Sequence, residues 1–123
     1  MFNKDSKQST MQKGREAESF ACAFLEKKGF SILERNFYTR FGELDIIAQK
    51  GEVLYFVEVK SGVGFMPVYN LSPTKIQHLQ KAIAIYLNKK RSKNPYYLSA
   101  VILTKQTQAE SFSVEWLENL TLY

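Results

Sequence analysis

The sequence lacks the features of a membrane-bound or disulfide-stabilised protein. It has one cysteine, Cys22, which excludes an internal disulfide, and it has no apolar run approaching the roughly 18 residues of a membrane helix. Its first ten residues, MFNKDSKQST, contain no apolar segment of the kind found in a secretory signal. These absences predict a cytoplasmic protein that does not contact a membrane.

Acidic residues are absent from the stretch between Gly62 and Ala109, which contains seven lysines and arginines. The rest of the 123-residue chain contains 10 basic and 12 acidic residues, so the net charge of +5 comes from that one stretch. A basic region beside a carboxylate-bearing region suits a polyanionic partner such as a nucleic acid. A solvated, lysine-rich helix face would give the same composition, so the charge pattern alone leaves both interpretations open.

Length and composition fit one folded domain. Hydrophobic residues make up 45% and charged residues 24% of the chain, as in an ordinary globular protein. Polar residues dominate the first ten positions. We therefore expect a flexible N-terminus over residues 1–10 and a single domain over residues 11–123.

Hydrophobic periodicity predicts two helices and five strands. The first helix covers about residues 11–28, and the second begins with Ser72 as cap and Pro73 in the first turn and ends in the basic run 88–93. Segments rich in β-branched and aromatic residues predict strands over 30–37, 43–49, 53–60, 98–104 and about 111–115. A hairpin should join the strands 43–49 and 53–60, and the breaker-rich segment SGVGFMPVYNLSP after Lys60 should be a loop. The order α-β-β-β-α-β-β predicts an α/β (α+β) fold with a mixed central β-sheet flanked by helices.

Charged residues occur inside the two hairpin strands, where burial is expected. Asp45 lies in the apolar context GELDIIA, and an isolated carboxylate would be costly there. Glu58 and Lys60 lie in LYFVEVK, where their spacing puts both side chains on the same face roughly 7 Å apart. The hairpin brings Asp45 near the level of Glu58, so two carboxylates and an ammonium group converge.

Two converging carboxylates repel each other, and a hard divalent cation such as Mg²⁺ or Mn²⁺ relieves that repulsion. Lys60 beside them can orient or deprotonate a water molecule and stabilise charge on a phosphate. This combination of two carboxylates, a divalent cation and a lysine is typical of a phosphodiesterase. A buried lysine–carboxylate pair without a catalytic role is the alternative for any single Glu-x-Lys motif.

Glu18 adds a third acidic group on the first helix. It shares a helical face with Ala21, Cys22 and Leu25, so it should point toward the sheet, whereas Glu16 should point to solvent. A capping or helix-dipole role is the other explanation for an acid near a helix N-terminus.

Several motifs together make a resemblance specific. Glu18-x-x-Ala21, Arg35-Asn36, Gly42-Glu43-Leu44-Asp45-Ile46-Ile47-Ala48 and Phe56-Val57-Glu58-Val59-Lys60, followed by Lys75, resemble in order and spacing the small bacterial YraN family. That family is similar to the restriction-endonuclease-like superfamily, in which an acid on one strand precedes Glu-x-Lys on the next. Archaeal Holliday-junction resolvases have a similar arrangement. The resemblance covers about residues 13–87.

The resemblance implies a metal-dependent endonuclease that hydrolyses phosphodiester bonds with Mg²⁺ or Mn²⁺. It implies Asp45 and Glu58 as metal ligands, Glu18 as a supporting ligand and Lys60 as the catalytic lysine. We expect DNA ahead of RNA as the substrate, structure-directed cleavage of branched or single-stranded DNA with little sequence specificity, and a homodimer that places two sites on two strands. A non-catalytic nucleic-acid-binding module of the same fold is the alternative.

Two positions depart from the pattern that the resemblance implies. Gly62 stands where the family usually has an arginine, and Tyr97-Leu98-Ser99 stands where it has Arg-Phe-Asp. Other basic residues are the candidates for contacts with nucleic-acid phosphates: Arg40, Lys75, Lys89, Lys90, Arg91 and Lys93.

Overall fold

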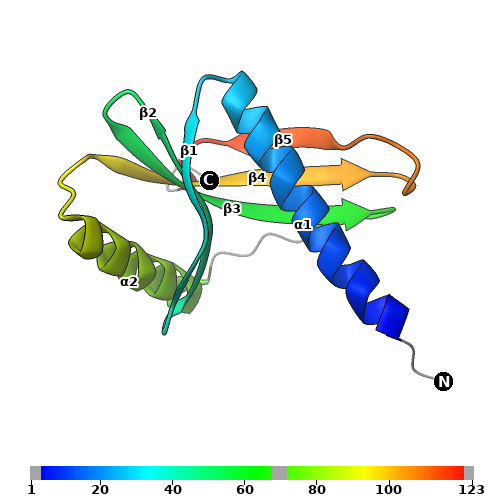
Figure 1. The fold of residues 1–123 in the computed structure, drawn as a ribbon, viewed down its shortest axis with the longest axis horizontal. Coiled ribbons are helices and arrows are strands. Elements are labelled where there is room, and N and C mark those ends of the chain that lie inside the picture. Colours follow the sequence, from blue (N-terminus) through cyan, green and yellow to red (C-terminus); the bar gives the residue numbers. More distant parts are fainter. Residues whose placement is uncertain (1–3, 68–71, 121–123) are drawn as a thin grey trace.

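The computed structural model of the chain describes residues 4–67 and 72–120, and their side chains from residue 14 onward. Its elements are α1 (Lys4–Lys27), β1 (Ser31–Thr39), β2 (Gly42–Lys50), β3 (Val53–Val63), α2 (Pro73–Lys90), β4 (Tyr96–Lys105) and β5 (Ser113–Leu117) (Figure 1). This order confirms the predicted mixed α+β architecture, which is that of a restriction-endonuclease-like fold. Within the described residues, neither helix is long and apolar enough to span a membrane.

The five strands form one sheet in the order β1-β2-β3-β4-β5. β1 pairs with β2, and β2 with β3, in antiparallel orientation. β4 and β5 are also antiparallel. β3 and β4 are parallel because α2 connects them and returns the chain to the starting end of the sheet. The predicted β2–β3 hairpin is confirmed, and its last pair before the turn is Lys50 with Val53.

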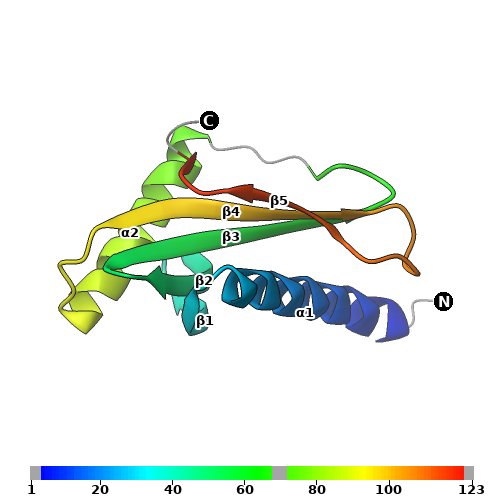
Figure 2. The same cartoon turned by 90° about the horizontal axis from the view of Figure 1, so that it is seen from above.

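The two helices cover opposite faces of the sheet (Figure 2). Alternating strand residues therefore contribute to two separate cores. The α1-side core contains Ala17, Ala21, Cys22, Leu25, Phe30, Ile46, Ala48, Tyr55, Val57, Val101 and Leu103. The α2-side core contains Phe37, Leu44, Ile47, Leu54, Phe56, Leu79, Ala82, Ile83 and Tyr86.

The start of α2 is determined by local sequence. The Ser72 hydroxyl accepts a hydrogen bond from the backbone N–H of Lys75 at 3.1 Å, and Pro73 occupies the first turn, as predicted. Arg91 ends the helix in the left-handed conformation, with φ of 51°. The cap places Lys75 in the first turn, beside the end of β3 that bears Lys60.

Some boundaries differ from the prediction. α1 begins at Lys4 instead of residue 11, because no glycine or proline interrupts residues 4–13. The prediction of a loop directly after Lys60 was wrong for residues 61–63. These residues continue β3, because they pair with β4 as far as Lys105. Residues 68–71 of that loop lie outside the described part of the chain. The flexibility expected of residues 1–10 stays a prediction.

Candidate active site

Asp45 lies where strands β2 and β3 separate. The last backbone pair of these strands on this side is Ile46 with Val57, so Asp45 and Glu58 are the next residues on each strand. The Asp45 carboxylate oxygen Oδ2 accepts a hydrogen bond from the backbone N–H of Val59 at 2.9 Å. The Asp45 side chain therefore takes the place of a β2 carbonyl group as the hydrogen-bond partner of β3. This bond holds the carboxylate beside Glu58.

A change of face in β1 and β2 brings Asp45 to this position. Residues two apart on a strand normally share a face, yet Leu44 packs in the α2-side core and Ile46 in the α1-side core.

On β1, Phe37 likewise packs toward α2, whereas Arg35 reaches Glu18 of α1. Asn36, between them, has a left-handed φ of 55°. Asparagine tolerates this conformation better than most residues, which allows the strand to switch faces there.

Glu58 is an almost fully buried acid, with 7% of its surface exposed. Burial, a hydrogen bond with the Asp45 side chain and the negative charge of Asp45 raise the pKa of Glu58 to about 8. The positive charges of Lys75 and Lys60 oppose this increase. This pKa favours the protonated form of Glu58 at neutral pH in the absence of a metal ion.

Lys60 and Lys75 complete the α2 side of the site. Lys60 lies two residues after Glu58 on β3, and Lys75 lies in the first turn of α2. Burial and the nearby charge of Lys60 lower the pKa of Lys75, which also interacts with Glu58 and Asp45. Lys75 was predicted as a phosphate contact on a basic helix, and the structure places it within the acid–lysine cluster itself.

Three carboxylates meet on the α1 side of Asp45. Glu18 of α1, Glu43 of β2 and Asp45 each offer an oxygen, and these oxygens lie within 4.8 Å of one another. Around an octahedral Mg²⁺ with bonds of about 2.1 Å, ligand oxygens are roughly 3.0 to 4.2 Å apart, so a small closing movement fits this group to the ion. Burial, followed by the charges of Asp45 and Glu18, raises the pKa of Glu43, and a cation beside it would favour its charged form.

Glu43 is the acid that the sequence analysis left unassigned. It is part of the motif Gly42-Glu43-Leu44-Asp45 and lies two residues before Asp45, so strand alternation was the signal that could have found it. Glu18 does point toward the sheet, as expected. Glu16 is exposed, as expected, with 58% of its side-chain surface accessible, and it forms an ion pair with the buried Lys105 at 3.5 Å.

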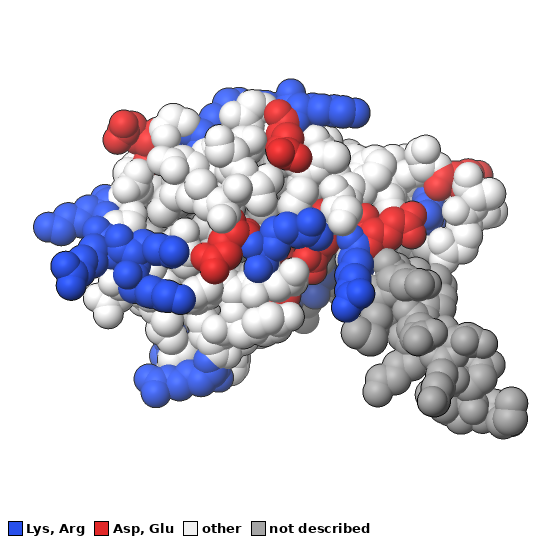
Figure 3. Space-filling model, viewed as in Figure 1, with Lys and Arg blue, Asp and Glu red and all other residues white. Residues whose placement is uncertain are grey.

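Most of the other predicted phosphate contacts lie away from the acids. Figure 3 shows basic side chains gathered at the left of the view, where Figure 1 places the C-terminal end of α2. Lys89, Lys90, Arg91 and Lys93 belong to this end and are exposed. Arg40 lies in the β1–β2 turn, where it and Lys81 both stack on the ring of Phe41, at 5.0 and 5.1 Å.

Gly62, the position that departs from the resembled pattern, cannot accept a side chain without rearrangement. A Cβ atom there would lie 2.5 Å from the carbonyl oxygen of Phe65. An arginine at this position would therefore require the segment after β3 to move. In this chain, Phe65 and Pro67 of that segment lie directly over the Gly62 backbone.

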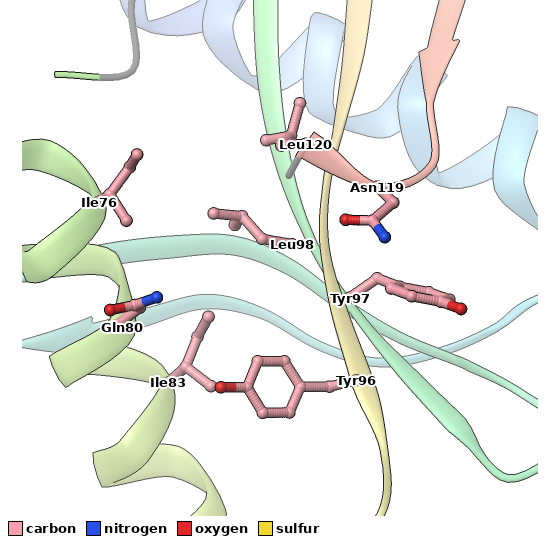
Figure 4. Close-up of a pocket in the computed structure, with 8 residues that line it drawn as sticks. All are labelled: Ile76, Gln80, Ile83, Tyr96, Tyr97, Leu98, Asn119 and Leu120. Carbon is pink, nitrogen blue, oxygen red and sulfur yellow. The ribbon is translucent and has the colours of Figure 1, made fainter. Parts of the chain in front are cut away.

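An apolar cavity of about 370 Å³ between α2, β4 and the C-terminal segment is a separate feature. Figure 4 shows Ile76, Gln80 and Ile83 of α2 facing Leu98 and Leu120, with Tyr96 closing one end and Tyr97 turned away. No acidic or basic residue lines it. The cavity therefore lacks the groups needed for the chemistry that Asp45 and its neighbours offer.

Comparison with known proteins agrees with the motifs that surround Asp45 and Glu58. Residues 17–118 match the sequence model of "Uncharacterised protein family UPF0102". The chain belongs to the UPF0102 family. This is the YraN-like family that the motifs indicate, so the predicted membership is confirmed.

The UPF0102 relatives cover nearly the whole chain. A UPF0102 protein of Helicobacter hepaticus is 47% identical over 114 residues, which are 93% of this chain and 98% of the relative. One from Wolinella succinogenes is 46% identical over 110 residues, covering 89% of this chain and 96% of the relative. A third, from Helicobacter pylori, is 43% identical and covers 89% and 91%. The similarity therefore includes every element of the site, from Glu18 to Lys75.

Proposed function

We propose that this UPF0102 protein is a metal-dependent nuclease that hydrolyses phosphodiester bonds, with DNA as the preferred substrate. One observation supports the proposal most directly. The Asp45 carboxylate, fixed by Val59, lies between the acids Glu18 and Glu43 on one side and the Glu58–Lys60 motif on the other. A structural ion pair would need only one acid for each lysine, whereas this cluster crowds four carboxyl groups together.

In this proposal Asp45 is the central metal ligand, with Glu58 and Glu18 as predicted and Glu43 as an additional ligand. A bound Mg²⁺ or Mn²⁺ would polarise the phosphate and activate a water molecule. Lys60 orients that water or takes its proton, and Lys75 stabilises negative charge on the phosphate oxygens. Glu58, whose pKa is raised by burial and by Asp45, would favour its charged form when a cation occupies the site, because the positive charge stabilises the carboxylate.

The substrate that we propose is recognised through its backbone. No recognised base-reading motif is present in the sequence, and a domain of 14.2 kDa offers little area for reading bases. Branched or single-stranded DNA is therefore a better candidate than a specific duplex sequence. A homodimer would extend the footprint and stays a prediction.

The test is cleavage of a four-way junction, a single strand, a matched duplex and an RNA strand by the full chain, with Mn²⁺, Mg²⁺ or EDTA. We expect cleavage only with metal, and a loss of several orders of magnitude in Lys60→Ala, because charge stabilisation at the transition state is lost. Glu52→Gln, which changes an exposed acid in the β2–β3 turn, is the matched control and should retain full activity. Metal-independent DNA binding without any cleavage would instead favour the non-catalytic binding module.

A further inference from the structure

A groove leads from the surface to the acids on the α1 side of the site. It lies between α1 and β1, has a volume of about 530 Å³ and contains Glu18 and Glu43 at one end. Its other lining residues are Gly14, Arg15, Ser19, Arg35, Asn36 and Tyr38. Because Glu18 and Glu43 belong to the group of three carboxylates, the groove opens directly onto the proposed metal site.

Two guanidinium groups flank this groove. Arg35 lies 3.6 Å from the Glu18 carboxylate and donates a hydrogen bond to the Ser19 hydroxyl at 3.3 Å. The Arg35 side chain is 38% exposed. Glu18 and Ser19 of α1 therefore hold one part of its guanidinium group, and the rest lines the groove. Arg15 lies one turn before Ser19 on the same helix and is exposed. Arginine in this setting suits phosphate, whose oxygens accept two parallel hydrogen bonds.

Tyr38 is the most exposed large apolar side chain among the described residues. It is 74% exposed and lies on the same groove wall as Arg35. An aromatic ring left in water beside cationic side chains is the combination that single-strand binding proteins use, with bases stacked on rings and phosphates held by cations. Tyr38 belongs to neither of the two cores.

The groove is small enough to hold only a short stretch of a strand. Its volume of about 530 Å³ falls in the range of small-molecule sites. An unpaired strand can lay its backbone between α1 and β1. Figure 3 shows acidic and basic side chains interspersed over this face, in contrast to the cluster of basic side chains at the left.

We infer that an unpaired nucleic-acid strand enters the site through this groove, where Arg15 and Arg35 bind its phosphates and Tyr38 stacks on a base. The inference rests on the proposed function, because it takes the acids at the inner end to be the place of cleavage. It goes beyond that function by naming the part of the substrate that is held and the residues that hold it. The Glu18–Arg35 ion pair connects the proposed metal site with the groove. A cation bound by Glu18 would free Arg35 to bind a phosphate.

The experiment measures binding without cleavage, so that it does not depend on nuclease activity. Fluorescence anisotropy compares a 12-nucleotide single strand with a duplex of the same sequence, in Ca²⁺ and in EDTA. We expect Arg15→Met and Arg35→Met each to weaken single-strand binding by about tenfold and duplex binding by less than about twofold. Lys27→Met, which removes an exposed charge from the end of α1, should change neither affinity by more than about twofold.

Stacking has its own measurement. Tyr38→Ala should weaken single-strand binding by about 5- to 150-fold and abolish the quenching of 2-aminopurine placed in the strand, whereas Tyr38→Phe should retain both. Tyr96→Ala removes an exposed tyrosine from the opposite side of the sheet and serves as the matched control. Melting temperatures of all variants verify folding, which is expected because Tyr38 and Arg15 are exposed.

A double variant separates phosphate binding from neutralisation of Glu18. If Arg35 only neutralises Glu18, then Arg35→Met combined with Glu18→Gln regains wild-type affinity, and the inference is overturned. It is also overturned if Tyr38→Ala and Arg15→Met leave the single-strand affinity unchanged, or if polyglutamate competes as well as a DNA strand. Groove-dependent strand binding without cleavage in Mn²⁺ would support this inference and refute the nuclease. Cleavage with no dependence on the groove would do the reverse.

Discussion

The Asp45 carboxylate accepts the backbone N–H of Val59 at 2.9 Å, across the point where β2 and β3 separate. A backbone donor within a sheet must have a partner, and here a functional side chain supplies it. The donor, Val59, is the residue after Glu58 on β3, so the bond holds the Asp45 carboxylate beside Glu58. The same carboxylate therefore has a structural partner and a set of acidic neighbours, and these two roles can be separated by substitution.

Asp45→Asn and Asp45→Ala should differ in stability. Asparagine keeps a side-chain oxygen that accepts the Val59 N–H, whereas alanine leaves this partly buried donor without its partner. We expect Asp45→Ala to be less stable than Asp45→Asn by about 1–3 kcal/mol in urea unfolding. Both variants should lose cleavage. Equal stability of the two would mean that the bond contributes nothing to the fold.

Glu58 should make the metal-free protein less stable as the pH rises. The unfolded chain loses the Glu58 proton near the ordinary pKa of 4.5, whereas the folded protein retains it to about pH 8. The unfolded state therefore binds fewer protons over this range, and the free energy of unfolding decreases between pH 4.5 and 8.

The measurement is unfolding in EDTA at a series of pH values. Glu58→Gln cannot ionise, so its decrease in stability should be smaller, by an amount on the order of a few kcal/mol. Mn²⁺ should stabilise the wild type more strongly at pH 8 than at pH 5, because the ion competes with the Glu58 proton. A parallel pH profile for Glu58→Gln would contradict the assignment of the proton to Glu58.

Glu43 should contribute to metal affinity. In Glu43→Gln, one of the three carboxylates within 4.8 Å is replaced by an uncharged amide, so we expect Mn²⁺ affinity to fall by at least about tenfold in calorimetric titration. Glu34→Gln, which changes an acid of β1 that faces Tyr86, is a suitable control. If both variants bind Mn²⁺ like the wild type, Glu43 is not a ligand.

The basic end of α2 should set the salt dependence of binding. Lys89, Lys90 and Lys93 are exposed, and each lost phosphate contact should reduce the slope of log affinity against log salt by about 0.9 on duplex DNA. Arg91 is left unchanged because its backbone ends the helix. The triple glutamine variant should therefore bind with a flatter slope. An unaltered slope would assign these lysines to a solvated helix face.

Local patterns predicted the parts of the fold that local interactions determine. The β2–β3 hairpin follows from strand alternation on either side of Gly51, and the start of α2 follows from Ser72 and Pro73. The approach of Asp45 to Glu58 followed from the same hairpin, whereas its exact register, with Ile46 opposite Val57, could be read only from the structure.

The remaining features of the fold and of the site depend on contacts between residues that are distant in the sequence. The pairing of Glu18 with Arg35 requires α1 to cross β1 at one angle, which no periodicity reports. The left-handed conformation of Asn36 changes the face of every residue after it, whereas an alternating pattern assumes an uninterrupted strand. Lys75 approaches Glu58 only because α2 packs across the sheet, so its sequence neighbours predicted only a contact with nucleic-acid phosphate.

The length of α2 sets a length scale for any molecule that contacts both of its ends. Lys75 lies in its first turn and Lys90 is its last residue, and fifteen residues of α-helix extend about 22 Å. At about 3.4 Å per nucleotide of B-form strand, this distance corresponds to roughly six or seven nucleotides. An oligonucleotide shorter than that can occupy the acid–lysine cluster or the basic end of the helix, but not both, so the helix acts as a ruler for the minimum substrate length.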